Sequence, residues 1–98
     1  VAGIPYTQAE GFALGYYQNN VAYSEALYAF FQLASIRLSG NSIGTEAPIW
    51  GDVAVIEAWL SGKGKITTAN LPAVTPEVMT AANNIEQWLD ANDCDFSS

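Results

Sequence analysis

The chain of 98 residues lacks histidine entirely and contains a single cysteine, Cys94. Without histidine it has neither the commonest general base of enzymes nor the commonest ligand of zinc sites. It also lacks the side chain that ordinarily titrates near neutral pH. One cysteine cannot form a disulfide within the chain, so disulfides do not hold the fold together. We therefore expect no metal site and no cofactor.

Charge is also scarce, and positive charge most of all. Charged residues make up 13% of the chain, and ten Asp and Glu outnumber three Lys and Arg, giving a net charge of −7. Average proteins contain about 25% charged residues. A negative field repels phosphate backbones and anionic lipid, and no basic stripe offsets it. We therefore expect no binding to nucleic acid and no anchoring to an acidic membrane surface.

The motifs that could carry catalysis fail at individual residues. In the GKGK stretch at 62–65, Trp59 stands where a phosphate-binding loop begins with glycine, and Ile66 replaces its Ser or Thr. The acidic neighbours of Cys94 disfavour its thiolate form, which is the nucleophile. The sequence predicts that the protein is not an enzyme, and a carboxylate- or cofactor-dependent enzyme is the least favoured hypothesis.

Four segments show helical periodicity together with helix start or stop signals. They cover roughly residues 8–19, 21–39, 48–61 and 76–91. The sequence therefore predicts an all-α fold, a compact bundle of about four helices, in a single domain spanning 1–98. Residues 92–98 are expected to form a frayed acidic tail.

Local signals mark where these helices begin. Thr7 and Glu10 form a capping box before the first helix, and Thr75 caps the last one, which has proline in its first turn. Pro48 is expected in the first turn of the third helix. Asn19 and Asn20 are expected to end the first helix and to cap the second.

The second helix is apolar over most of its circumference. Its polar residues form one narrow stripe: Ser24, Tyr28, Gln32, Ser35 and Ser39. A membrane-spanning helix needs about 20 predominantly apolar residues, whereas this segment is interrupted by Glu25, Gln32 and Arg37. We therefore expect the central helix of a bundle rather than a transmembrane segment.

Apolar positions at helical spacing predict the core. The core candidates are Phe12, Leu27, Phe30, Leu33, Val53, Ile56, Trp59, Val78, Ile85 and Leu89. Aromatic residues make up 12% of the chain, which is more than a small core is expected to bury completely. Tyrosine suits interfaces because its ring is apolar and its hydroxyl can meet water. The interface candidates are Tyr16, Tyr17, Tyr23, Tyr28 and Phe31.

Two functional hypotheses remain open. Low charge and surplus aromatics favour a non-catalytic structural or protein-interaction subunit of a homo-oligomer or larger assembly, such as a virion-like particle. Its partner would be another protein or a second copy of the chain. The alternative is a small helical carrier that encloses an apolar ligand, for which only Arg37 offers a charged anchor.

Overall fold

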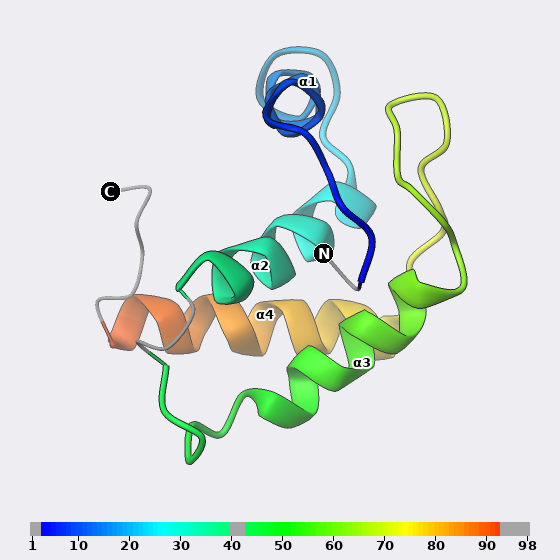
Figure 1. Cartoon of the computed structure of the whole chain (residues 1–98). Coiled ribbons are helices and arrows are strands. Elements are labelled where there is room, and N and C mark those ends of the chain that lie inside the picture. Colours follow the sequence, from blue (N-terminus) through cyan, green and yellow to red (C-terminus); the bar gives the residue numbers. More distant parts are fainter. Residues whose placement is uncertain (1–2, 40–42, 93–98) are drawn as a thin grey trace.

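The structure is a computed structural model that describes residues 3–39 and 43–92. Within these ranges four helices follow one another: α1 (Gln8–Asn20), α2 (Glu25–Ser39), α3 (Trp50–Ser61) and α4 (Pro76–Ala91) (Figure 1). The same ranges contain no β-strand beyond one isolated bridge between Thr67 and Asn70. The predicted all-α bundle of about four helices is confirmed. Helix α2 ends at Ser39, as predicted, and residues 93–98 of the expected tail lie outside the described residues.

The start signals of the first and last helices act as their sequences predict. The Thr7 hydroxyl accepts from the Glu10 N–H at 3.1 Å, and the Glu10 carboxylate accepts from the Thr7 N–H at 2.8 Å. This capping box satisfies two backbone donors that α1 itself cannot pair. The Thr75 hydroxyl accepts from the Val78 N–H at 3.3 Å and caps α4.

The second helix begins later than predicted, at Glu25 instead of residue 21. The Gln18 amide accepts from the Ser24 N–H at 2.7 Å and donates to the Ser24 carbonyl at 3.0 Å, which holds the chain in a corner before α2. Ser24, not Asn20, then provides the cap, since its hydroxyl accepts from the Leu27 N–H at 3.3 Å. Asn20 instead closes α1, because its amide donates to the Tyr16 carbonyl.

The third helix also begins later than predicted, at Trp50. Pro48 lies in the turn before it, and Ile49 is the N-cap without a side-chain hydrogen bond. The Gly44 carbonyl accepts from the Ala47 N–H at 3.2 Å and from the Trp50 indole at 2.8 Å. These two bonds keep the segment in a turn up to the start of α3.

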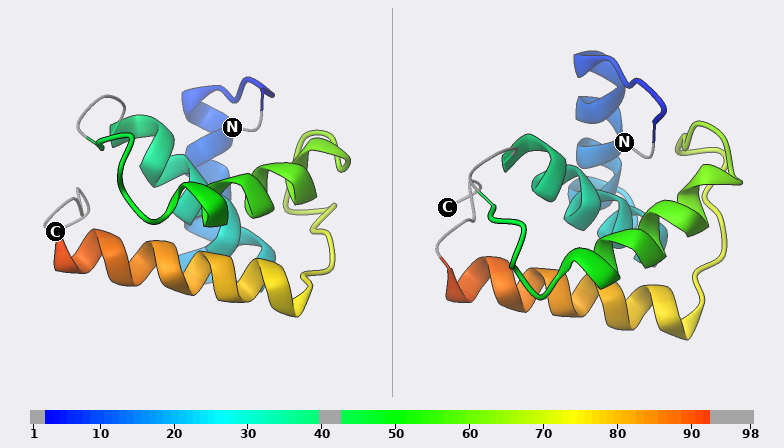
Figure 2. Two further views of the ribbon diagram at one scale, coloured as in Figure 1. Left: turned by 90° about the horizontal axis from the view of Figure 1, so that it is seen from below. Right: turned by 60° about the horizontal axis from the view of Figure 1, so that its bottom comes forward.

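Helices α2, α3 and α4 pack around one core, and α1 stands at a steep angle across α2 (Figures 1 and 2). A polar contact joins each pair of the three packed helices: Arg37 with Glu57 between α2 and α3, Tyr28 with Asn83 between α2 and α4, and Asn84 with Asp52 between α4 and α3. No helix in the described residues is both long enough and apolar enough to cross a bilayer.

Most of the core candidates lie inside. The structure buries Leu27, Phe30, Leu33, Val53, Ile56, Val78, Ile85 and Leu89, and Trp59 packs partly buried against them. The expectation for Phe12 is wrong, since this residue is 68% exposed. Leu14 is the one residue of α1 that the structure buries. Two residues apart on a helix are about 200° apart, so burying Leu14 turns Phe12 outward.

Candidate interaction surface

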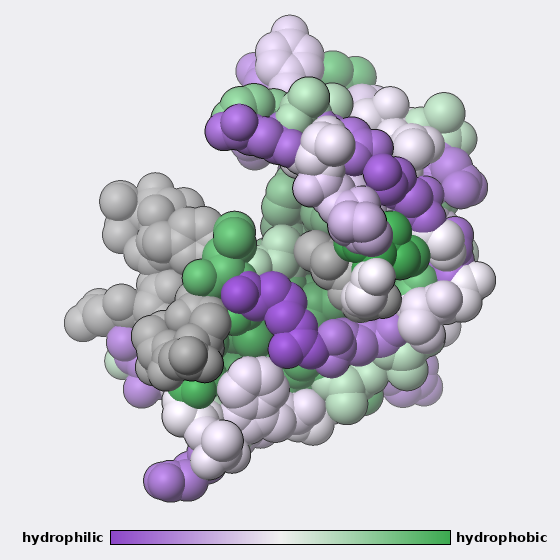
Figure 3. All heavy atoms as spheres, in the orientation of Figure 1, coloured by the Kyte–Doolittle hydropathy of each residue, from purple (hydrophilic) through white to green (hydrophobic). Residues whose placement is uncertain are grey.

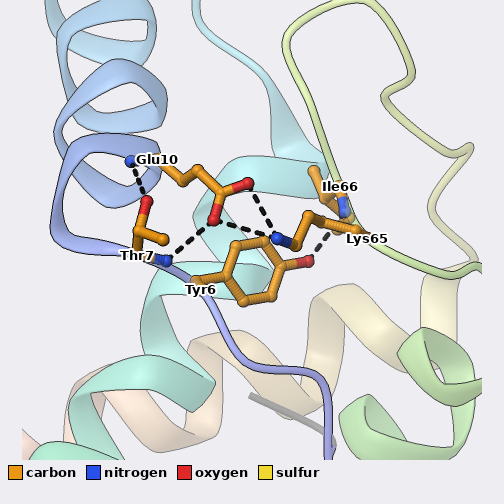
Figure 4. A network of polar contacts seen from close by, with 5 residues as sticks. All are labelled: Tyr6, Thr7, Glu10, Lys65 and Ile66. Carbon is orange, nitrogen blue, oxygen red and sulfur yellow. Dashed lines mark hydrogen bonds and ion pairs between the residues drawn. The ribbon is translucent and has the colours of Figure 1, made fainter.

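The N-terminal end of α1 is anchored by a network that reaches the link between α3 and α4 (Figure 4). The Lys65 ammonium donates to both Glu10 carboxylate oxygens, at 2.8 and 2.9 Å, and lies 5.5 Å from the centre of the Tyr6 ring. The Tyr6 hydroxyl accepts from the Ile66 N–H at 2.7 Å. Gly64 supports this arrangement because its φ of +71° is one that glycine adopts without strain.

Electrostatics reinforces this anchor. The Lys65 ammonium, and after it the Thr7 N–H, lower the pKa of the Glu10 carboxyl below its ordinary value. The contact with Lys65 therefore favours the ionised form of Glu10. The one acidic residue of α1 is thus engaged with the link between α3 and α4.

The C-terminal end of α1 is anchored by the corner that precedes α2. Gln18 binds both backbone groups of Ser24, Leu14 enters the core, and Tyr17 packs partly buried against it. Gly15 lies beside α2: a methyl group built on it would meet the Phe31 ring at 4.0 Å, an ordinary contact distance. Helix α1 is therefore fixed at both ends, and no element within residues 3–39 and 43–92 covers its outward face.

The outward surface of this helix consists of Ala9, Phe12, Ala13 and Tyr16, which we call the α1 face. All four residues are exposed, Phe12 at 68% and Tyr16 at 66%. Their spacing of three, one and three residues places them on one side of the helix. Figure 3 shows apolar and weakly polar atoms over α1 at the top of the molecule, with strongly hydrophilic atoms beside them, and a hollow beneath this helix.

The α1 face carries no charge. Glu10 is the single charged residue of α1, and it is held by Lys65 away from this face. The remaining exposed residues of the helix are Gln8, Asn19 and Asn20, which are polar and uncharged. An apolar centre with an uncharged polar rim has the composition of a protein interface core, which is depleted in charge.

The structure separates the five interface candidates. Tyr16 and Tyr23 are exposed, at 66% and 67%. Tyr17, Tyr28 and Phe31 are partly buried and pack against the core. The Tyr28 hydroxyl donates to Asn83 at 2.9 Å, and burial, with the nearby Glu86 carboxylate second, raises the pKa of Tyr28. These three side chains therefore join the helices to one another instead of forming one open patch.

Sequence reasoning missed Phe12, Ala9 and Ala13 as surface residues. Helical spacing places Phe12 and Tyr16 on one face, and the usual expectation turns such a face toward the core. The opposite side of α1 offers Leu14 with Gln18, whose amide forms the corner before α2. The sequence signal for an outward face was therefore the presence of Leu14 and Gln18 on the opposite side of the helix, where they could make the inward contacts instead.

The described residues contain no candidate metal site. In 3–39 and 43–92, no three His, Cys, Asp or Glu side chains gather to hold a metal ion. Cys94 and the acids at 93 and 95 lie outside these ranges.

No known family model matches the chain, and no curated protein or solved structure matches it.

Proposed function

We propose that the protein is a non-catalytic interaction subunit that binds another protein chain through the α1 face. One observation carries this proposal: a helix fixed at both ends exposes two aromatic rings side by side on an uncharged surface. Contiguous exposed apolar patches on folded domains mark sites of interaction. A helix needed only to cover the core would turn these rings inward, where their burial would add to stability.

The chemistry of this face favours protein over other partners. Nucleic acid and anionic lipid would meet a molecule of net charge −7 whose three basic residues include Lys65 and Arg37, both engaged with carboxylates. Rings of Phe and Tyr are enriched in protein interfaces, where a few central, desolvated residues supply most of the binding free energy. Phe12 and Tyr16 would be the anchors, and the two alanines would allow close approach.

Site-specific photo-crosslinking in the cells that express the protein tests the proposal. A benzophenone amino acid replaces Phe12 in one variant and Leu38 in the other, because Leu38 on α2 is equally open to solvent, at 75% exposure. We expect a defined protein adduct from position 12, none from position 38, and loss of the adduct when Tyr16→Gln is added. No adduct at position 12, or the same adducts at both positions, would overturn the proposal.

A further inference from the structure

We propose that the partner on the α1 face is a second copy of this chain, so that the protein forms a two-fold homodimer through antiparallel α1 helices. This inference rests on the proposed function and names its partner. Three properties of the α1 face bear on it: the order of large and small residues points to a second copy, the absence of charge permits one, and the area that the face can bury limits the strength.

The first property is self-complementarity. Along the face the order is small, large, small, large: Ala9, Phe12, Ala13, Tyr16. If a second α1 runs antiparallel about a two-fold axis between positions 12 and 13, Phe12 lies opposite Ala13 of the second copy, and Ala9 lies opposite Tyr16. The symmetry repeats both contacts, so every ring meets an alanine.

Other arrangements of the same two helices lack this fit. In a parallel pair in register, Phe12 faces Phe12 and Ala9 faces Ala9, which crowds the rings and leaves gaps between the alanines. Interfaces and cores pack well when large and small residues alternate across facing positions. The spacing of three and four residues is also the spacing of helices that pack side by side. The pattern therefore selects the antiparallel orientation.

The second property is the distribution of charge. Each copy carries −7, so two copies repel unless the charges stay away from the contact. The α1 face meets this condition because all four of its residues are uncharged and Glu10 is bound to Lys65. A partner of complementary charge would gain nothing from this face, whereas a second copy brings an equally uncharged surface. Antiparallel helices also place opposite ends of their dipoles together.

The third property is the area, which sets the strength. A large aromatic side chain buries about 150–250 Å², so rings that are two-thirds exposed offer roughly 130 Å² each, or about 500 Å² for four rings. With the alanines and the polar rim, the dimer buries on the order of 800 Å², which is below the 1,200–2,000 Å² of stable complexes. We therefore expect a weak, reversible dimer.

Sedimentation equilibrium of the full chain from about 5 µM to 1 mM tests this dimer. A reducing agent prevents intermolecular disulfides through Cys94. We expect the mass to rise from the monomer value of 10.5 kDa toward twice that value. Phe12→Gln should weaken association about tenfold or more, as expected for a central anchor residue. The matched variant Leu38→Gln should leave it unchanged. A dimer that survives Phe12→Gln would overturn the inference.

A mixing experiment tests the antiparallel register. One variant carries Ala9→Lys and the other Tyr16→Glu, at positions that face each other only in the antiparallel arrangement. The equimolar mixture should associate more strongly than either variant alone, because the introduced ammonium then meets the introduced carboxylate while the remaining Tyr16 and Ala9 keep their native contact. If the average mass of the mixture in sedimentation is no higher than that of either variant alone, the antiparallel register is overturned. Far-ultraviolet circular dichroism confirms that both variants are folded.

The two proposals fail in different ways. If the purified chain stays monomeric at 1 mM while crosslinking at position 12 still yields an adduct with a different protein, the homodimer is overturned and the interaction function stands. If the chain is monomeric and position 12 gives no adduct, both are overturned. An adduct of twice the chain's mass together with concentration-dependent sedimentation supports both.

Discussion

At the scale of single residues, aromatic side chains of similar size occupy three environments in this small domain. Phe30 is buried and contacts the Tyr6 and Phe31 rings edge to face, at 5.1 and 5.3 Å between centroids. Phe31 is partly buried between α2 and α1, and Phe12 is open to solvent. Burial decides how much each ring contributes to the free energy of unfolding, because apolar area removed from water is the main stabilising quantity.

The loss of stability on substitution by alanine should therefore decrease from a buried side chain to a partly buried one and to an exposed one. Leu27→Ala, at a fully buried position, should lower the free energy of unfolding by about 2–5 kcal/mol. Phe31→Ala should cost about 2 kcal/mol, since its ring is only partly buried. Phe12→Ala should change it by about 0.5 kcal/mol or less in the monomer. Urea unfolding below about 5 µM measures all three, and a loss above about 2 kcal/mol for Phe12→Ala would place that ring in the core.

The contact between Glu10 and Lys65 should make the attachment of α1 depend on pH. The folded-state pKa of Glu10 lies below its ordinary value of 4.5. The carboxylate therefore contributes stability at every pH above this value, and the contribution is lost as the pH falls through the lowered pKa.

Glu10→Gln should be less stable than the parent chain at pH 6, and the difference should shrink as the pH falls below 4.5 and through the lowered pKa of Glu10. Lys65→Met removes the first cause of the lowered Glu10 pKa. In this variant the loss of stability on acidification should therefore be smaller than in the parent chain. Urea unfolding at pH values from 3 to 6 measures the effect. A difference between parent and Glu10→Gln that stays constant over this range would contradict the assignment.

At the scale of helices, end signals could be predicted where the residues involved are close in sequence. The capping box at Thr7 and the cap at Thr75 need only the next three residues, and both are present as expected. The start of α2 depends on Gln18, six residues before Ser24, and the orientation of α1 depends on Ile66, sixty residues after Tyr6. Periodicity predicts that α1 is a helix, but contacts this distant decide which of its faces turns inward.

The cap of α4 gives a prediction at this scale. Thr75→Ala removes the acceptor for the Val78 N–H and should lower the free energy of unfolding by about 1 kcal/mol. Thr80→Ala is the matched control, because Thr80 is exposed within the same helix and alanine is the better helix former there. Thermal unfolding should therefore show a lower melting temperature for the first variant and an equal or higher one for the second. Equal losses in both variants would show that Thr75 does not act as a cap.

At the scale of the whole molecule, the charged residues and the proposed contact surface lie on different parts of the chain. Among the described residues, the part of the chain outside α1 supplies most of the core and all the charge except that of Glu10, while α1 supplies an uncharged aromatic face. An interaction subunit of this kind gains association from apolar area and loses it through repulsion between like-charged copies. Added salt removes the repulsion and leaves the apolar contribution in place.

Association of the purified chain should therefore strengthen with ionic strength. The screening length falls from about 30 Å at 0.01 M salt to about 8 Å at 0.15 M, so two copies of charge −7 repel much less at the higher value. We expect the dissociation constant from sedimentation to fall severalfold over this range, with Phe12→Gln associating about tenfold or more weakly than the parent chain at both salt concentrations. An interface held by ion pairs would respond in the opposite direction, because salt screens attraction as well. Association that weakens with salt would therefore show that the copies meet through charged residues and not through the α1 face.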